Sequence, residues 1–450
     1  MNLLKIDDTI CAIATGGNES AIAVIRVTGD NAIKFTNSIF SKNLINVSSH
    51  SIHYGDIIEN NEIIDEVLVS VFKKNNSFTG EETTEISCHG SIYIQEKIIQ
   101  SLISSGCRLA KPGEFSMRAF KNGKIDLSQA ESIADLISSK SKAEQQVAIK
   151  QLKGGVSNQL KILRTQLIDF ASLIELELDF SEEDVEFVDR NKLKNLLYDI
   201  KNEIELLIDS FKTGNAIKNG IPVTIIGSPN AGKSTLLNSI LNEDKAIVSE
   251  IAGTTRDIVE DKLIINGVMF RFIDTAGIRK TDNKIENIGI DKAIENMNKS
   301  NIIIQLIDST DNVDKQIKKL NKLSNNSTAS KIIAINKIDI KNNTSVDKAI
   351  YLSAKKNIGI DTLKEKLIEL SSINKLSNKT TIITNTRHLQ ELKNTIDEVN
   401  LIISALDNNI SSEFIASNIR EALNHLGSIT GNITNDTLLK NIFSKFCIGK

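Results

Sequence analysis

Short apolar runs alternate with polar turns over the first 120 residues of the chain, which is the pattern of β-strands. Two stretches between these runs, near 30–40 and 95–104, have helical spacing instead. The strand-like runs are 9–14, 21–27, 66–72 and 84–88. We therefore predict a mixed α/β domain at the start of the chain.

Beyond this domain the hydrophobic period becomes that of helices. Apolar stripes run through 160–178 and 193–211, and Gly214 is the expected helix stop. Helical spacing returns at 388–406 and 412–426. Because each helical block alone would expose its apolar stripe, we predict one bundle with the intervening segment inserted into it.

The inserted segment begins with an apolar strand, a glycine-bounded loop and the start of a helix. The loop reads Gly-Ser-Pro-Asn-Ala-Gly-Lys-Ser from Gly227 to Ser234. Such a loop cradles a polyphosphate: its amides meet the negative charge, Lys233 reaches the β- and γ-phosphates, and the Ser234 hydroxyl binds Mg²⁺. The predicted phosphate contacts are Asn230, Ala231, Gly232, Lys233, Ser234 and Thr235.

Two later loops favour guanine as the base. Asn-Lys-Ile-Asp at 336–339 and Ser-Ala-Lys at 353–355 each follow an apolar run. The Asp339 carboxylate can accept from the N1–H and 2-amino groups of guanine, whereas adenine would leave it without a donor. The motifs together predict GTP, with base-side contacts from Asn336, Lys337, Asp339, Ser353, Ala354 and Lys355.

Two stretches between these loops are predicted to hold the γ-phosphate and Mg²⁺. Asp-Thr-Ala-Gly at 274–277 is expected to bind Mg²⁺ through water, and Thr255 is the expected second hydroxyl ligand. The aliphatic Ile278 that follows cannot orient the attacking water. The predicted GTP contacts here are Ser249, Glu250, Ile251, Ala252, Gly253, Thr254, Thr255, Asp274, Thr275, Ala276 and Gly277.

The segment from Gly227 to Glu286 resembles the GTPase domain of the tRNA modification family MnmE, also called TrmE. The sequence motifs that carry the resemblance are Asn-Ala-Gly-Lys-Ser, Ile-Ala-Gly-Thr-Thr-Arg-Asp, Asp-Thr-Ala-Gly-Ile-Arg and Ile-Glu-Asn-Ile-Gly-Ile. The resemblance implies that a K⁺ ion replaces an arginine finger and that Glu286 orients the attacking water. A fixed cation there would stabilise charge that grows in the transition state. The implied K⁺ ligands are Asn230, Ser249, Ile251 and Thr254.

The first domain resembles the N-terminal domain of the same family, through sequence motifs at 77–82, 88–90 and 111–131. The resemblance implies dimerisation and binding of a 5-formyl- or 5,10-methylene-tetrahydrofolate. A carboxylate suits the amino-pyrimidinone edge of a folate, and cations suit its glutamate tail. The implied folate contacts are Arg26, Glu85, Lys124 and Lys450.

The last five residues, Phe-Cys-Ile-Gly-Lys at 446–450, are similar to the family's C-terminal signature. The resemblance implies that they reach the folate site, where Cys447 would act as nucleophile or acid/base. Two departures from the family pattern, at 15–18 and at Ser91, affect the wall of this pocket.

Composition sets outer limits on these predictions. A chain of 450 residues has room for about three domains. The chain has 54 Lys and Arg against 57 Asp and Glu, a net charge of −3. This charge argues against a protein that binds nucleic acid over its whole surface, so any RNA contact must come from a local patch or a partner. The lysine-rich stretch 315–331 is interpreted as a solvated face and not as an RNA-binding patch. We expect a cytoplasmic protein without a membrane span.

The predicted fold class is α/β plus all-α. Residues 1–120 form the folate-binding and dimerisation domain, 121–217 plus 378–450 a discontinuous helical domain, and 218–377 an inserted, Ras-like doubly wound P-loop GTPase domain. The resemblance implies a homodimeric, K⁺-dependent GTPase that works with an FAD-containing MnmG (GidA) type partner in a heterotetramer. Together they would add a carboxymethylaminomethyl or aminomethyl group to C5 of the wobble uridine, position 34, of certain tRNAs. A ribosome-assembly GTPase switch and a non-catalytic, folate-responsive scaffold remain alternatives.

Overall fold

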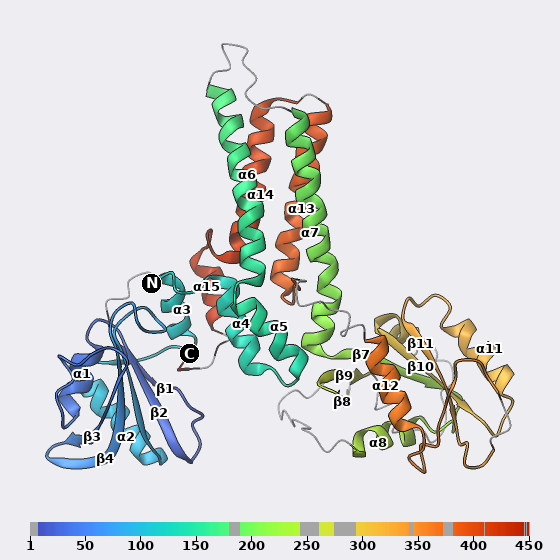
Figure 1. Cartoon of the computed structure of the whole chain (residues 1–450), viewed down its shortest axis with the longest axis horizontal. Helices are drawn as coiled ribbons and strands as arrows, with labels where there is room; N and C mark the ends of the chain where they lie inside the picture. Colours follow the sequence, from blue (N-terminus) through green and yellow to red (C-terminus); the bar gives the residue numbers. More distant parts are fainter. Residues whose placement is uncertain are drawn as a thin grey trace. The chain divides into compact units, whose positions relative to one another are not determined.

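The computed structural model describes two compact units of the chain (Figure 1). The first contains residues 1–134, 151–190 and 398–450, and the second contains 135–150 and 191–397. Each unit has its own six-stranded sheet. The described residues are 8–179, 190–243, 261–273, 294–341, 345–371, 381–408, 410–444, 446 and 448–449. No helix among them is long and apolar enough to cross a membrane.

The sheet of the first unit has the strand order β3-β4-β5-β2-β1-β6 and is antiparallel except between β1 and β6. Along β2, Ile25 and Val27 enter the core beneath the helices α1 and α2, so Arg26 between them lies on the opposite face. The elements are β1 Ile10–Ile13, β2 Ser20–Thr28, α1 Ala32–Ile39, β3 Ser51–Glu59, β4 Glu62–Phe72, β5 Thr83–Gly90, α2 Ile92–Ser104 and β6 Arg108–Leu109.

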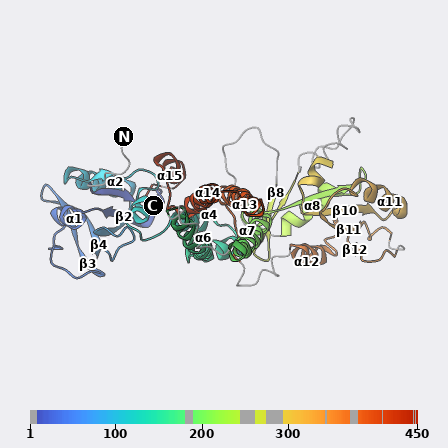
Figure 2. The same ribbon diagram turned by 90° about the horizontal axis from the view of Figure 1, so that it is seen from above.

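Helices complete the first unit. Helices α6 and α14 pack side by side (Figures 1 and 2), and Arg420 of α14 forms an ion pair of 2.8 Å with Glu175 of α6. Helix α15 contacts α3 through a cluster that includes Met117, Phe443 and Phe446. The helices are α3 Glu114–Lys121, α4 Leu127–Ser138, α6 Gly155–Asp179, α14 Ser412–Thr430 and α15 Asp436–Phe443.

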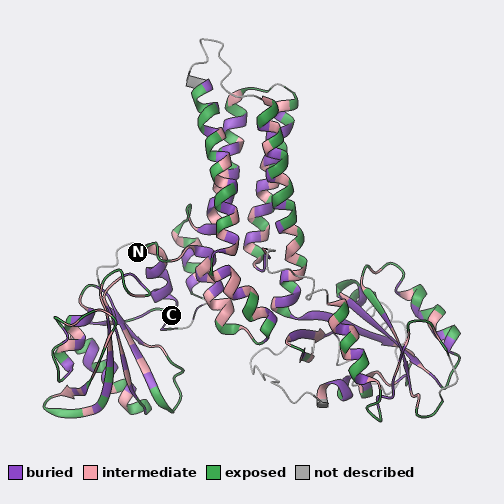
Figure 3. Ribbon diagram, in the orientation of Figure 1, coloured by how far each residue is buried: buried purple, intermediate pink, exposed green. Residues whose placement is uncertain are grey.

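The sheet of the second unit has the order β12-β11-β10-β7-β9-β8, and only β8 runs antiparallel to its neighbour. Its central strands are buried on both faces (Figure 3), as helices on both sides require. On β10, Ile304 faces the cluster of α8 and α12, whereas Ile303 faces that of α11. The strands are β7 Ile221–Gly227, β8 Asp261–Ile265, β9 Val268–Phe272, β10 Ile302–Asp308, β11 Ser330–Asn336 and β12 Ile350–Tyr351.

The doubly wound arrangement confirms the predicted fold class, whereas the division into three domains stays a prediction. The helices of this sheet are α8 Lys233–Glu243, α11 Val313–Leu323 and α12 Ile360–Leu370. The other long helices are α5 Lys142–Leu152, α7 Arg190–Asn219 and α13 Thr386–Asp407, the last two of which lie where helical spacing predicted them.

The predicted helix stop at Gly214 is wrong, because α7 continues to Asn219. A Cβ at position 214 would collide with the carbonyl oxygen of Ile383, so the glycine permits close passage of another segment. The helix ends before Gly220, whose φ of +86° lies in the left-handed region.

Candidate functional site

The carboxyl ends of three parallel strands meet at one edge of the second unit's sheet. Gly227 ends β7, Asp308 ends β10 and Asn336 ends β11. The register pairs Gly227 with Leu306 and Asp308 with Asn336, so the loops that follow are neighbours. In open α/β sheets this edge is where ligands bind.

The loop between β7 and α8 depends on two glycines. Gly232 has φ +94°, and a Cβ there would collide with Nδ2 of Asn336. A Cβ at Gly227 would collide with the carbonyl oxygen of Leu306. Asn230 also has a left-handed φ of +64° and is exposed. The loop therefore curls closely over the strand ends, as a phosphate cradle must.

Lys233, at the start of α8, folds back over this loop. Its Nζ donates to the carbonyl oxygens of Gly227 at 2.9 Å and Ser228 at 3.0 Å. Burial lowers the pKa of Lys233. An anionic phosphate beside the ammonium group would favour its charged form again. Ser234 and Thr235 occupy the next two positions of the same turn.

Asn336 joins the phosphate side of the site to the base side. This side chain is 3% exposed, and its Nδ2 donates to the carbonyl oxygen of Ala231 at 2.8 Å. Its Oδ1 accepts from the backbone N–H of Ala354 at 3.0 Å. The structure therefore brings three of the predicted motifs together through a single buried amide.

The Asp339 carboxylate is exposed beside Ser353. Ser353 Oγ donates to Asp339 Oδ1 at 2.6 Å, and this bond lowers the pKa of Asp339. The carboxylate therefore stays anionic and acceptor-only at neutral pH, as recognition of the two guanine donors requires. Lys355 follows in the same loop and is exposed.

Two residues at this edge, Asp308 and Gln316, were not predicted from the sequence, whereas Lys337 was. Lys337 forms an ion pair of 2.6 Å with Asp308. Burial raises the pKa of Asp308, but hydrogen bonds from Lys337 and Thr310 outweigh burial and lower it. Gln316 of α11, 6% exposed, accepts from the Asp308 N–H at 3.1 Å, donates to the Asp308 carbonyl at 3.0 Å and accepts from Ser228 Oγ at 3.5 Å.

A sequence signal for Gln316 does exist. It is a polar residue on the apolar side of an amphipathic helix, between Val313 and Leu320. Buried amide groups are almost always hydrogen-bonded, so the position of Gln316 alone suggests that its side chain forms hydrogen bonds within the protein.

Part of the predicted site lies outside the described residues. These predictions concern the remaining GTP, Mg²⁺ and K⁺ contacts, the water-orienting glutamate and two residues near the end of the chain. They are Ser249, Glu250, Ile251, Ala252, Gly253, Thr254, Thr255, Asp274, Thr275, Ala276, Gly277, Glu286, Cys447 and Lys450.

In the first unit the structure brings Arg26 and Glu85 together across β2 and β5. Arg26 Nε donates to Glu85 Oε1 at 2.8 Å, and Nη2 lies 2.7 Å from the same oxygen. The guanidinium carbon lies 5.9 Å from the ring centroid of Phe78 and 5.7 Å from that of Phe115. Arg26 Nη1 also donates to the carbonyl oxygen of Gly449 at 3.5 Å.

Gly449 lies close to the first sheet. Its φ is +93°, and a Cβ there would collide with the carbonyl oxygen of Ile13. Lys124 is not part of this contact: its Nζ donates to the carbonyl oxygen of Asn75 at 2.8 Å. The structure thus joins Arg26, Glu85 and the segment 448–449, and leaves Lys124 with a different partner.

Two family profiles match most of the chain. The profile of the MnmE helical domain matches residues 127–447, and that of the GTP-binding protein TrmE N-terminus matches residues 9–124. A tRNA modification GTPase MnmE of Flavobacterium psychrophilum is 50% identical over 98% of this chain and 99% of its own length. The chain belongs to the MnmE family.

A second MnmE relative, from Cytophaga hutchinsonii, is 49% identical over 98% of both chains. Among solved structures, the FeoB G-domain of Methanococcus jannaschii is 25% identical and covers 34% of this chain and 97% of its own, with a TM-score of 0.25. A score this low supports no fold argument, so the assignment of the G domain depends on the strand order and site geometry above.

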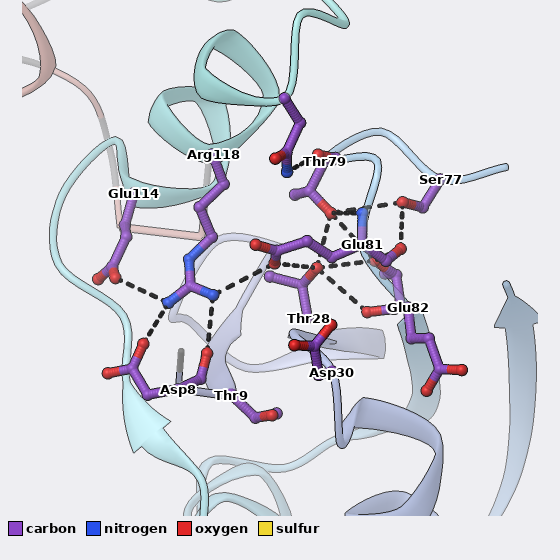
Figure 4. Close-up of polar contacts among 12 residues, drawn as sticks. Asp8, Thr9, Thr28, Asp30, Ser77, Thr79, Glu81, Glu82, Glu114 and Arg118 are labelled. Atoms are coloured by element: carbon purple, nitrogen blue, oxygen red, sulfur yellow. Dashed lines mark hydrogen bonds and ion pairs between the residues drawn. The ribbon is translucent and has the colours of Figure 1, made fainter. Parts of the chain in front are cut away.

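The sequence motif at 111–131, which strongly resembles the MnmE family, contributes Glu114 and Arg118 to a network of ion pairs (Figure 4). Arg118 is fully buried and donates to Asp8 Oδ1 at 2.7 Å, Glu114 Oε1 at 3.1 Å and Glu81 Oε2 at 3.2 Å. Burial raises the pKa of Glu114, but hydrogen bonds from Arg108, the Lys111 amide and Arg118 outweigh burial and lower it. A buried arginine needs such partners, so these charges serve the fold.

Proposed function

We propose that this chain is a K⁺-dependent GTPase that helps to modify the wobble uridine, position 34, of certain tRNAs. With an FAD-containing partner of the MnmG (GidA) type, it adds a carboxymethylaminomethyl or aminomethyl group to C5 of that base. The observation that carries the proposal is the Asn336 amide, which joins the phosphate loop to the base-side loop in a chain whose relatives are named tRNA modification GTPases.

The residues divide the work of GTP hydrolysis. Asp339 accepts the guanine donors, and Lys233 neutralises charge on the β- and γ-phosphates. Water attacks the γ-phosphorus, the bond to the β–γ bridging oxygen breaks, and Glu286 orients the water.

Two cations fit the donors of this site. The Ser234 hydroxyl, half-buried in the first turn of α8, and Thr255 would hold Mg²⁺. The exposed Asn230 side chain would hold K⁺ together with Ser249, Ile251 and Thr254. Both ions supply positive charge that stabilises the transition state.

The Arg26–Glu85 pair fits a tetrahydrofolate. A half-buried carboxylate and a guanidinium lie side by side, and two aromatic rings lie within 6 Å of the guanidinium carbon, at 5.9 and 5.7 Å. Lys124 and Lys450 would bind the glutamate tail, and Cys447 would act as nucleophile or acid/base at the one-carbon unit. The bound cofactor, a 5-formyl- or 5,10-methylene-tetrahydrofolate, supplies that carbon.

The assembly we propose is a homodimer within a heterotetramer that contains the MnmG-type protein and binds tRNA in the cytoplasm. Nucleoside analysis of tRNA from a strain that lacks this protein tests the proposal. We expect unmodified C5 at the wobble uridine, restored by the wild-type chain but not by a Lys233→Ala variant. Normal levels of the C5-modified uridine in the deletion strain would reject the proposed function.

The K⁺ requirement has its own test. At equal ionic strength, GTP hydrolysis by the purified chain should be about tenfold or more faster in KCl than in NaCl, because one preorganised charge at the reaction centre has an effect of at least this size. The Asn230→Ala variant should lose most of the difference. Equal rates in the two salts would remove K⁺ from the mechanism.

A further inference from the structure

Helix α11 of the second unit has two chemically different faces. Val313, Gln316 and Leu320 are buried against the sheet. Lys315, Lys318, Lys319 and Lys322 are all exposed, and we call them the lysine stripe. Their spacing of i, i+3, i+4 and i+7 places them on one arc of roughly 100° around the helix.

Helix stability does not explain the lysine stripe. Like charges three and four residues apart destabilise a helix by about 0.2–0.5 kcal/mol per pair, and the stripe contains four such pairs. The helix dipole favours a cation only in the last turn, where Lys322 lies. Among the residues that the structure describes, none of these four side chains forms an ion pair.

The sequence alone indicates a solvated face here, but the structure adds two observations. The four charges form one continuous surface in a chain whose net charge is −3. The opposite face of the same helix is held at the site edge by Gln316, which bonds to Asp308 and Ser228. The stripe is therefore carried on a helix that is attached to the phosphate loop.

We propose that the lysine stripe binds the phosphate backbone of the tRNA substrate. This inference rests on the proposed function and adds a surface to it. Lysine is a compact charge on a flexible stem, which suits phosphates but reads no bases. The interaction is therefore electrostatic, independent of sequence and sensitive to salt.

The test is tRNA binding by the full chain across a range of KCl concentrations. The stripe variant carries Lys315→Gln, Lys318→Gln, Lys319→Gln and Lys322→Gln. The control variant removes the same charge elsewhere in the second unit through Lys262→Gln, Lys341→Gln, Lys348→Gln and Lys366→Gln. GTP hydrolysis without tRNA, unchanged in both variants, shows that they are folded.

We expect the stripe variant to bind tRNA about tenfold or more weakly, whereas the control stays within about twofold of wild type. The slope of log K against log salt should fall by about 0.7–0.9 for each phosphate that the variant no longer neutralises, or about 3–4 in all for four lysines. A double variant, Lys315→Gln with Lys319→Gln, should show about half of the slope change.

Three outcomes would overturn the inference. Equal tRNA binding by the stripe variant and the wild type would reject tRNA binding by the lysine stripe and leave the proposed function intact. No salt-sensitive tRNA binding by the wild-type chain would also reject the inference, whereas the proposed function is tested separately by the nucleoside analysis, because the partner could supply the RNA contact. Stripe-dependent binding to phosphatidylglycerol vesicles, with tRNA binding unchanged, would assign the surface to a lipid instead.

Discussion

At the scale of single residues, Asn336 uses both ends of its side chain within the protein. One end holds Ala231 and the other holds Ala354, so the amide sets the distance between the phosphate and base sides of the site. In the proposed function, recognition of the base belongs to the exposed Asp339. Motif spacing predicts both residues, but only the fold shows that one supports the site and the other faces outwards.

Asp339→Asn should reverse the preference of the site among purine nucleotides. The amide N–H of the new side chain would face the 2-amino group of guanine, and an unpaired donor costs about 1–3 kcal/mol, or roughly 5- to 150-fold in affinity. XTP carries an acceptor at that position and should bind better than GTP. Competition between the two nucleotides measures the change, and Ser353→Ala serves as the control that keeps the preference for GTP. A variant that still prefers GTP would contradict the assignment of Asp339.

Gln316→Met should loosen the phosphate loop without changing its chemistry. The replacement keeps the length of the side chain but loses two hydrogen bonds to Asp308 and one to Ser228, at about 0.5–1.5 kcal/mol for each bond. We expect the Kd of GTP to rise about three- to tenfold, with selectivity for GTP over XTP unchanged. Lys318→Met on the exposed face of the same helix is the matched control. Equal affinities of the two variants would show that Gln316 only fills space.

At the scale of elements, the sequence predicts those features that depend on local pattern. Strands β1, β2, β4 and β5 and helices α1 and α2 lie where the periodicity predicts them. Strand β3, at Ser51–Glu59, was not predicted, because Ser-Ile-His-Tyr-Gly-Asp contains no continuous apolar run. Gln316 was missed because its role depends on which face of α11 meets the sheet. The prediction that a helix ends at Gly214 failed because glycine is needed there for close contact with the backbone of Ile383, which is distant in the sequence.

Gly214→Ala tests this account of α7. Alanine is the better helix former by about 1 kcal/mol, so a purely local view expects stabilisation. The new Cβ would meet the backbone of Ile383, which cannot rotate away, and overpacking costs about 1–3 kcal/mol. We expect a lower midpoint of urea unfolding, whereas Asn215→Ala on the exposed side should leave it unchanged or raise it. A Gly214→Ala chain as stable as the wild type would show that the two segments can move apart.

At the scale of the whole molecule, the two groups of candidate residues belong to different compact units. Asn336, Asp339 and Lys233 lie in the second unit, and Arg26 and Glu85 lie in the first. Each group obtains its geometry from its own sheet: one from the carboxyl ends of parallel strands, the other from facing positions on antiparallel strands. We therefore predict that each ligand binds without a residue from the other group.

This separation predicts that folate binding and GTP turnover can be abolished independently. Arg26→Met keeps the length of the apolar stem but removes the ion pair with Glu85 and the bond to Gly449. We expect this variant to lose tetrahydrofolate binding in equilibrium dialysis and C5 modification of the wobble uridine in cells, while GTP turnover stays within about twofold of wild type. Lys233→Ala should do the reverse in vitro, with folate bound normally and GTP hydrolysis abolished, because the proposed role of its charge is to neutralise the phosphates of GTP. If Arg26→Met slowed GTP hydrolysis as much as Lys233→Ala, the two groups would have to form one catalytic unit, and the independence argued from their separate sheets would be wrong.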